Sequence, residues 1–355
     1  MRPCLACESM GSAVALEAIM ADGCLLVGDI GATNARFALA NSRAPGFSAA
    51  VTLKCADFAS AELAIKHYRE SINAPAPDAV CLAVAGPIVD QSVQFTNSDW
   101  SISAEELTAM FSISSVLLLN DFEAIAYSVP FLSDADCLPV GLPENGPLAD
   151  GDHTIGILGP GTGLGAAGLC KRGERYIAIA GEASHGGFAP ESQIQLEILT
   201  RLRERFERVS AERLASGPGL ENIYWALARI HGERKSQLSA AEIFARCINN
   251  SDPCAAEAVQ MFFEILGQVA GDLVLTLGAR DGIFIAGGIV PRYPDLFIKS
   301  RFRHAFENKG RYRSLMECIP GKLITHSQPG LLGASCCAMQ MFHGSQPALG
   351  IRDHW

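Results

Sequence analysis

The chain has 355 residues, of which 49% are hydrophobic and 19% charged, so it can fill a sizeable core and is long enough for two domains or one large α/β unit. Its 28 Lys and Arg against 38 Asp and Glu give a formal net charge of −10. This balance argues against a general nucleic-acid partner, because a phosphate backbone needs clustered basic side chains. It leaves small anionic ligands open, since backbone amides and a metal ion can hold them.

Cysteine usage and hydropathy indicate the compartment. The 12 cysteines are scattered, and many lie in apolar runs where a free thiol behaves as a small hydrophobic group. No apolar run approaches about 18 uninterrupted residues, so we expect no membrane-spanning helix. Glu8 and Glu17 interrupt the apolar core that a secretory signal would need. We therefore expect a reduced, cytoplasmic protein with no membrane partner.

An N-terminal extension over residues 1–22 precedes the first regular elements. CLLVGDIG, ARFALA and AAVTLKCA then read as three strands so close together that they predict an antiparallel meander. The pattern next predicts a helix over 60–72, a buried strand over 79–88, a helix that a capping box of Ser103 and Glu106 starts, and a strand over 115–121.

Pro and Gly crowd residues 130–151 and predict a crossing between domains. Two strands at 154–159 and 166–170 then enclose a Gly/Thr turn, which repeats the strand, turn and strand of residues 24–40. A long helix over 251–280 leads to a strand over 282–288 that ends in a Gly pair. Strands alternating with helices predict an α/β architecture with its binding loops at the carboxyl ends of strands.

Three Gly-rich turns follow buried strands. They are Gly28 to Asn34, Gly159 to Gly165, and Ala286 to Gly288. Glycine lets a backbone approach a phosphate, exposed amides and Thr hydroxyls donate to its oxygens, and an Asp in the first turn is suited to hold Mg²⁺. Any one such turn also fits a tight β-hairpin, but three at strand ends favour phosphate binding.

Polar side chains follow other strands and loops. Asn120 and Asp121 end an apolar strand, where the Asp121 carboxylate suits either a general base or the N-cap of the helix that follows. Glu182 and His185 would share one face of a helix as metal ligands, but the Gly and Pro after them favour a loop that binds a polyol. Glu212, by position alone, reads as a solvated helix residue.

Seven segments in this order carry a specific resemblance: GDIGATNARFAL, FTNSDW, LLLNDFEAIAY, GPGTGLG, GEASHGGFAP, LASGPGLENIY and IFIAGGIVPR. Together they resemble bacterial glucokinase of the hexokinase type over about residues 24–340. The resemblance implies the two-domain actin-like, ribonuclease-H-like ATPase fold of sugar kinases, with an interdomain cleft. We expect a smaller α/β domain over 23–131, completed by a C-terminal helix over 330–355, and a larger α/β domain over 132–329.

The resemblance also implies an activity and a set of residues. The activity is transfer of a phosphoryl group from ATP to the 6-hydroxyl of glucose, giving glucose 6-phosphate and ADP at the entry to glycolysis, in an enzyme that is a homodimer. Asp121 falls on the catalytic base. The sugar ligands beside it are Asn97, Asn120, Glu182, His185 and Glu212. The nucleotide ligands are Gly28, Asp29, Ile30, Gly31, Ala32, Thr33, Gly161, Thr162, Gly163, Gly287 and Gly288. Asp29 is also expected to hold Mg²⁺ through water.

The chain departs from the family pattern at two places. Ala183 and Ser184 stand where Gly-Gly is usual, which leaves sugar selectivity open, and Ala32 stands where a second Gly is usual, a change small enough to keep phosphate binding. The alternatives are a kinase for another hexose, such as mannose or fructose, and a non-catalytic sugar-responsive regulator or chaperone-type ATPase of the same fold.

Overall fold

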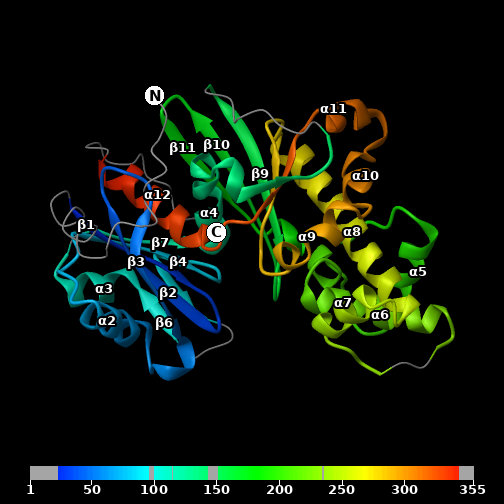
Figure 1. Ribbon diagram of the computed structural model, residues 1–355, viewed down its shortest axis with the longest axis horizontal. Coiled ribbons are helices and arrows are strands. Elements are labelled where there is room, and N and C mark those ends of the chain that lie inside the picture. The colour runs from blue at the N-terminus through cyan, green and yellow to red at the C-terminus, as the bar shows by residue number, and fades with distance from the viewer. Residues whose placement is uncertain (1–22, 96–99, 114, 143–150, 234–235, 344–355) are drawn as a thin grey trace. The chain divides into compact units, whose positions relative to one another are not determined.

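The computed structural model describes residues 23–95, 100–113, 115–142, 151–233 and 236–343. The chain forms two units (Figure 1). The first takes the described residues up to Leu132 and those from Ser327 onward, and the second runs from Ser133 to His326.

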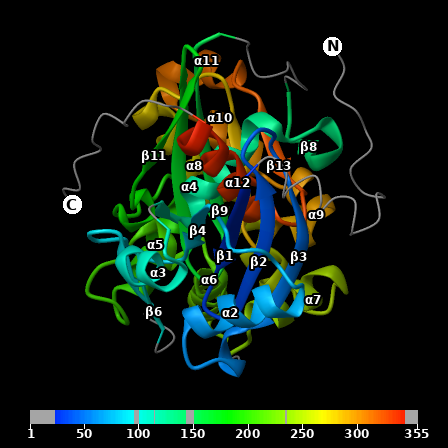
Figure 2. The same cartoon turned by 90° about the vertical axis from the view of Figure 1, so that its left-hand side faces the viewer.

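A five-stranded sheet forms the centre of the first unit, in the order β3-β2-β1-β4-β7. Its strands are β1 (Cys24–Ile30), β2 (Asn34–Asn41), β3 (Phe47–Lys54), β4 (Ala79–Val84) and β7 (Val116–Asn120). The first three pair antiparallel, which confirms the predicted meander, and Figure 2 shows them side by side. β4 runs parallel to β1, and β7 runs parallel to β4.

Both faces of this sheet are covered because its apolar residues occupy both sides of the strands. In β1, Leu26 and Ile30 belong to one buried cluster, whereas Leu25 and Val27 belong to another. This alternation follows the two-residue period of a strand. The first cluster packs against α2 (Ala61–Ser71) and α3 (Ala104–Phe111), near the small hairpin of β5 (Ser92–Gln94) and β6 (Ser101–Ser103). The second packs against α4 (Asp121–Ser128) and α12 (Pro329–His343).

The helix starts of this unit follow their sequence signals with one difference. Ser60 accepts a hydrogen bond from the Leu63 amide and caps α2 as expected. Ser103 caps α3 through the amide of Glu105, but in this described segment Glu106 does not return the second bond of the predicted capping box.

The second unit is built on a six-stranded sheet in the order β11-β10-β9-β12-β13-β8. Its strands are β8 (Cys137–Pro139), β9 (His153–Pro160), β10 (Leu164–Arg172), β11 (Arg175–Ala180), β12 (Ile283–Ile285) and β13 (Gly321–Ile324). β9 lies between an antiparallel β10 and a parallel β12, as β1 lies between β2 and β4. The repeat predicted from the sequence is therefore present in the topology.

The helix α8 (Pro253–Leu277) passes through the core of this unit, against α6, α7 and α10 (Figure 1). Asp252 caps it, Pro253 occupies its first position, and Gly278 ends it with φ +65°. α8 is long and apolar enough to cross a membrane, but 72% of its most apolar stretch is buried inside the unit, as in a core helix. The other helices are α5 (Gln193–Leu202), α6 (Gly217–Ile230), α7 (Ala240–Ile248), α9 (Pro294–Ile298), α10 (Phe302–Glu307) and α11 (Arg313–Glu317).

Candidate active site

The first Gly-rich turn joins β1 to β2. The Gly31 amide donates to the Asn34 carbonyl at 3.0 Å, and the Cys55 amide donates to the Thr33 carbonyl at 2.9 Å. Ala32 and Thr33 are exposed at its tip. Two backbone hydrogen bonds thus fix the turn, while its exposed tip can contact a ligand.

Two of the residues that the resemblance assigns to phosphate binding, Gly28 and Ile30, lie inside β1. Gly28 is buried, and a Cβ there would come within 2.7 Å of Leu82 Cδ2. The Ile30 side chain is completely buried. Both residues support the turn by packing, because a small residue and a large apolar one fill the space that the neighbouring strands leave.

Asp29 presents a half-buried carboxylate beside this turn. Arg36, its partner across the β1–β2 hairpin, places Nη1 3.2 Å from Asp29 Oδ2. A Cβ on Gly330, in the first turn of α12, would come within 2.8 Å of Asp29 Cγ. Burial raises the pKa of the Asp29 carboxyl above its usual range, and the Arg36 guanidinium opposes that shift. A carboxylate that is desolvated and only partly neutralised favours a further cation beside it.

Asn120 and Asp121 reach the same edge of this sheet. Ile30 pairs with Val84, and Val84 pairs with Asn120, so the strand ends are aligned. Since neighbouring strands lie about 4.8 Å apart and β4 lies between β1 and β7, Asn120 lies roughly 10 Å across the sheet from the end of β1.

The helix cap at this edge is Asn120, so the interpretation of Asp121 as the N-cap is wrong. Asn120 Oδ1 accepts from the Phe122 amide at 2.9 Å, and Glu123 Oε2 accepts from the Asn120 amide at 2.9 Å, which completes a capping box. Asp121 is the first residue of α4, and its Oδ1 also lies 2.9 Å from the Phe122 amide. Its carboxylate is therefore not needed as the cap.

The second and third Gly-rich turns meet in the second unit. The Gly161 amide donates to the Gly163 carbonyl at 2.8 Å and closes the turn after β9. The Ile289 amide donates to the Pro160 carbonyl at 3.2 Å. Gly287 has φ +84°, and a Cβ on it would come within 2.5 Å of the Pro160 carbonyl oxygen, so this approach requires glycine.

His185 ends a short 3₁₀ turn, Ala183–His185, and Glu182 directly precedes this turn as its N-cap residue, so neither lies on an α-helix. Both side chains are more than half exposed, and His185 Nε2 lies 3.7 Å from Glu182 Oε2. Among the residues that the structure describes, no three potential ligands are grouped as a metal ion would require. The pair instead offers an acceptor and a ring nitrogen to a polar ligand.

Glu212 belongs to the same part of the second unit. It lies on the 3₁₀ turn Ala211–Arg213, and its Oε2 accepts a hydrogen bond from the Leu164 amide at 3.0 Å. The Ala211 amide also donates to the Gly186 carbonyl at 2.9 Å. The interpretation of Glu212 as a solvated helix residue is thus wrong, because the fold brings it between the Gly161–Gly163 turn and the turn of Glu182 and His185.

Sequence reasoning missed Arg36 and Gly330, two residues that contact Asp29 or lie against it. Arg36 was detectable, since a hairpin symmetric about the turn after Ile30 pairs it with Asp29. Gly330 carried no signal, because its contact with Asp29 spans the length of the unit's sequence. Asn97, a predicted sugar ligand, lies outside the described residues.

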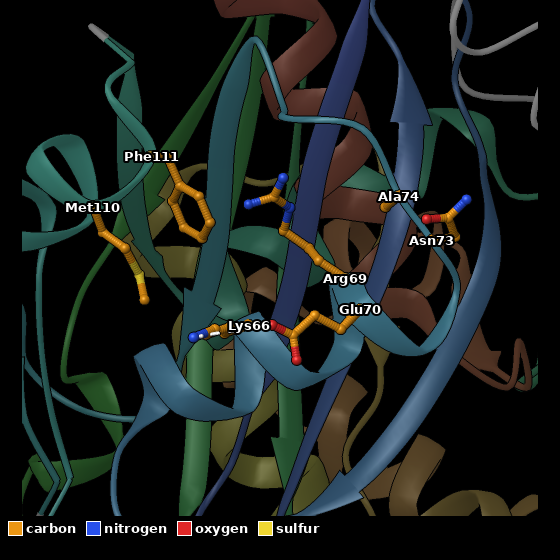
Figure 3. A pocket seen from close by; sticks show the side chains of 7 residues that line it. All are labelled: Lys66, Arg69, Glu70, Asn73, Ala74, Met110 and Phe111. Carbon is orange, nitrogen blue, oxygen red and sulfur yellow. Dashed lines mark ion pairs between the residues drawn. The ribbon is translucent and has the colours of Figure 1, made fainter.

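A separate hollow of about 450 Å³ lies between α2 and α3 (Figure 3). Its cations already have partners: Arg69 lies 5.0 Å from the centre of the Phe111 ring and donates to the Pro75 carbonyl, and Lys66 pairs with Glu70 at 3.9 Å. No predicted site residue lines it. The candidate site therefore stays with the Gly-rich turns and their polar neighbours.

Comparison with known proteins identifies the family of the chain. The family model for glucokinase matches residues 26–341. The glucokinase of Nitrobacter hamburgensis is 41% identical over 312 residues, which cover 87% of this chain and 95% of that protein.

Solved structures agree in fold. The crystal structure of a glucokinase from an Antarctic psychrotroph has a TM-score of 0.82 and 33% identity, covering 90% of this chain and 99% of that one. A ROK family glucokinase from Streptomyces griseus, in complex with glucose and AMPPNP, has a TM-score of 0.59 and 19% identity, covering 90% of this chain and all of that one, and so shows the likeness of fold alone. The family match, the relative and the two-unit α/β fold establish that this chain belongs to the glucokinase family, the sugar kinases that phosphorylate glucose.

Proposed function

We propose that Asp121 is the general base that accepts the proton of the glucose 6-hydroxyl as this oxygen attacks the γ-phosphorus of ATP. The observation that carries the proposal is the strand register of the first unit, which aligns the ends of β1, β4 and β7 and so sets Asp121 at the edge that holds the Gly31–Thr33 turn. Phosphoryl transfer needs positioning and charge stabilisation above all, and a carboxylate beside a phosphate turn suits this step.

Asn120 acts as a sugar ligand in this proposal. Its Oδ1 is used by the Phe122 amide, which fixes the orientation of the side-chain amide and leaves Nδ2 to donate to a hydroxyl. In the second unit, Glu182, His185 and Glu212 are the proposed partners of the sugar hydroxyls. Donors and acceptors fixed in this way discriminate between sugars that differ in one hydroxyl, because a wrong sugar leaves a polar group unpaired.

The nucleotide is bound by backbone groups. The turns Gly31–Thr33 and Gly161–Gly163 bind the phosphates. The Gly31 and Gly161 amides close these turns, and the other amides and the Thr hydroxyls donate to phosphate oxygens, while Gly287 and Gly288 lie on the adenosine side. Asp29 fits an Mg²⁺ ion held through water, since its desolvated carboxylate is only partly neutralised by Arg36. When bound, the ion neutralises charge on the phosphate oxygens.

The proposal extends to the cellular compartment and the oligomeric state of the enzyme. Every cysteine in the part of the chain that the structure describes has a free thiol, which suits the reducing cytoplasm where ATP is available. We propose that the enzyme acts there as a homodimer, which sedimentation equilibrium of the purified protein would test.

A coupled assay of ADP release over a panel of hexoses tests the substrate. We expect kcat/KM for glucose to exceed that for mannose and fructose. A higher kcat/KM for mannose or for fructose would instead identify that sugar as the substrate. No turnover with any hexose would contradict the proposal and favour a regulator or chaperone-type ATPase.

A further inference from the structure

We propose that Glu212 is also a positioning residue for the second phosphate turn, so that the glucose site and the nucleotide site share one carboxylate. This inference rests on the proposed function, because it takes Glu212 as a sugar contact. It adds that the same side chain holds the Gly161–Gly163 turn in the shape that binds phosphate, even when no sugar is present.

The backbone at the start of β10 gives the first reason. Leu164 is 3% exposed, so its amide needs a partner inside the protein. Its strand neighbour is Pro160, whose carbonyl already accepts from the Ile289 amide at 3.2 Å. Glu212 Oε2 supplies the acceptor at 3.0 Å. A hydrogen bond from an amide to a carboxylate is stronger than one between neutral groups.

Close packing gives the second reason. A Cβ on Gly163 would lie 2.6 Å from Glu212 Oε2, so the carboxylate rests directly against the turn. The segment that follows Glu212 holds the other end of the turn, because the Gly217 amide donates to the Gly161 carbonyl at 2.9 Å. The Ser216 hydroxyl donates to the Glu212 carbonyl at 2.7 Å and fixes this segment internally. Glu212 and Gly217 therefore hold the two ends of the Gly161–Gly163 turn in place.

The other side of Glu212 is joined to the sugar turn. The Ala211 amide donates to the Gly186 carbonyl at 2.9 Å, and Gly187 forms an antiparallel bridge with Ser210. The turn of Glu182 and His185 is thus bonded, through Gly186 and Gly187, to the residues directly before Glu212. A sugar hydroxyl that donates to Glu212 acts on a carboxylate that already bonds to the phosphate turn, and any resulting change in affinity is reciprocal.

Nucleotide binding without glucose tests the inference. Titration calorimetry with AMPPNP and no sugar is expected to give about a 10-fold weaker Kd for Glu212→Ala than for the wild type, since the turn loses one charge-assisted bond. Glu212→Gln keeps an acceptor for the Leu164 amide and should weaken the Kd by less than about 3-fold. Glu182→Ala is the matched control, because it removes an exposed sugar-side carboxylate and should leave the Kd unchanged.

Hydrogen exchange gives a second readout that does not depend on affinity. We expect the Leu164 amide to exchange at least about 10-fold faster in Glu212→Ala than in the wild type or Glu182→Ala, with the melting curve of each variant confirming its fold. An unchanged AMPPNP Kd and an unchanged Leu164 exchange rate in folded Glu212→Ala would overturn the inference while leaving the proposed function intact. Failure of the wild type to bind or phosphorylate glucose would instead overturn the proposed function.

Discussion

The turn after β1 and the turn after β9 follow the same strand–turn–strand pattern, yet different parts of the chain hold them. The first is held largely within the β1–β3 meander and its end, since Arg36 pairs with Asp29 and the Cys55 amide donates to the Thr33 carbonyl. The second is fixed from afar, since Glu212 lies 48 residues from Leu164. Two turns with similar sequences are thus held by different kinds of contact. Substitutions in the two turns should therefore affect stability and substrate binding differently.

The two turns also differ in electrostatics. The first has a desolvated carboxylate beside it, which costs stability while it is charged. The second uses a carboxylate to satisfy a buried amide, which stabilises the turn. We therefore expect stability to respond most to a change of charge at the first turn. At the second turn, we expect substrate binding to respond most to a change in side-chain size.

The largest effect in this comparison is expected for Asp29→Asn. Activity should fall about 10–100-fold, the usual cost of losing a group that orients a metal-bound water. Stability should move the other way. The folded state holds the Asp29 proton more tightly than the unfolded chain does, so this carboxyl lowers stability as pH rises above its ordinary pKa of about 4.

Urea unfolding of the wild type and Asp29→Asn between pH 4 and 8 checks this prediction. The variant should be the more stable protein at pH 7, and the difference should disappear as the pH falls towards about 4. Parallel stability curves over this range would show that Asp29 is not destabilised by burial.

The second turn offers a matched pair of glycines. A Cβ on Gly161 meets nothing within 4 Å, so Gly161→Ala should fold normally. It should raise the KM for ATP about 10-fold, because in the proposed site the added methyl group would obstruct the phosphate. Gly163→Ala should raise the KM values for both ATP and glucose, because its methyl group displaces Glu212. Steady-state kinetics with each substrate varied would separate the two, and a Gly163→Ala enzyme with normal glucose KM would break the link to Glu212.

A smaller effect is expected for Asn120→Asp. Aspartate caps a helix as well as asparagine does, so the melting temperature should stay close to that of the wild type. The change removes the Nδ2 donor, and the glucose KM should rise about 5-fold, the cost of one neutral hydrogen bond. Asn120→Ala is the control, since it loses the cap too and should melt at a lower temperature. An unchanged glucose KM in Asn120→Asp would remove Asn120 from the sugar ligands.

The smallest effect is expected at the departure from the family pattern. Ser184 is 2% exposed, and Ala183 lines a hollow of about 170 Å³ with Gln268 and Leu273 of α8. Because Ser184 is buried and the exposed Ala183 presents only a methyl group, replacing both by glycine should change the ratio of kcat/KM for glucose and mannose by less than about 2-fold. A 10-fold change in that ratio would show that the two residues set sugar selectivity.

Local signals in the sequence located several helix ends. Helix α8 was predicted from its apolar period, and Asp252, Pro253 and Gly278 mark its ends. The cap at Asn120 was also readable, since Glu123 stands three residues later, as a capping box requires. That spacing should have outweighed the interpretation of Asp121 as the cap.

Contacts between distant segments could not be predicted in this way. Nothing near Leu164 shows that its amide bonds to Glu212, because the partner is fixed only when the segment before α6 packs beside β10. The role of Gly330 is similar, since its need for a small side chain arises from a carboxylate on β1. Such constraints come from tertiary packing, and they leave no periodic pattern in the sequence from which they could be predicted.

The central claim is that Asp121 is the base, and Asp121→Asn tests it most directly. Because Asn120 rather than Asp121 caps α4, the variant should keep its fold, apart from a loss of about 0.3–1 kcal/mol for one charge at a helix N-terminus. It should also keep its affinity for AMPPNP. Its kcat with glucose should fall by about 10²–10⁴-fold, the usual contribution of a positioned base. A folded Asp121→Asn enzyme with the kcat of the wild type would contradict the account.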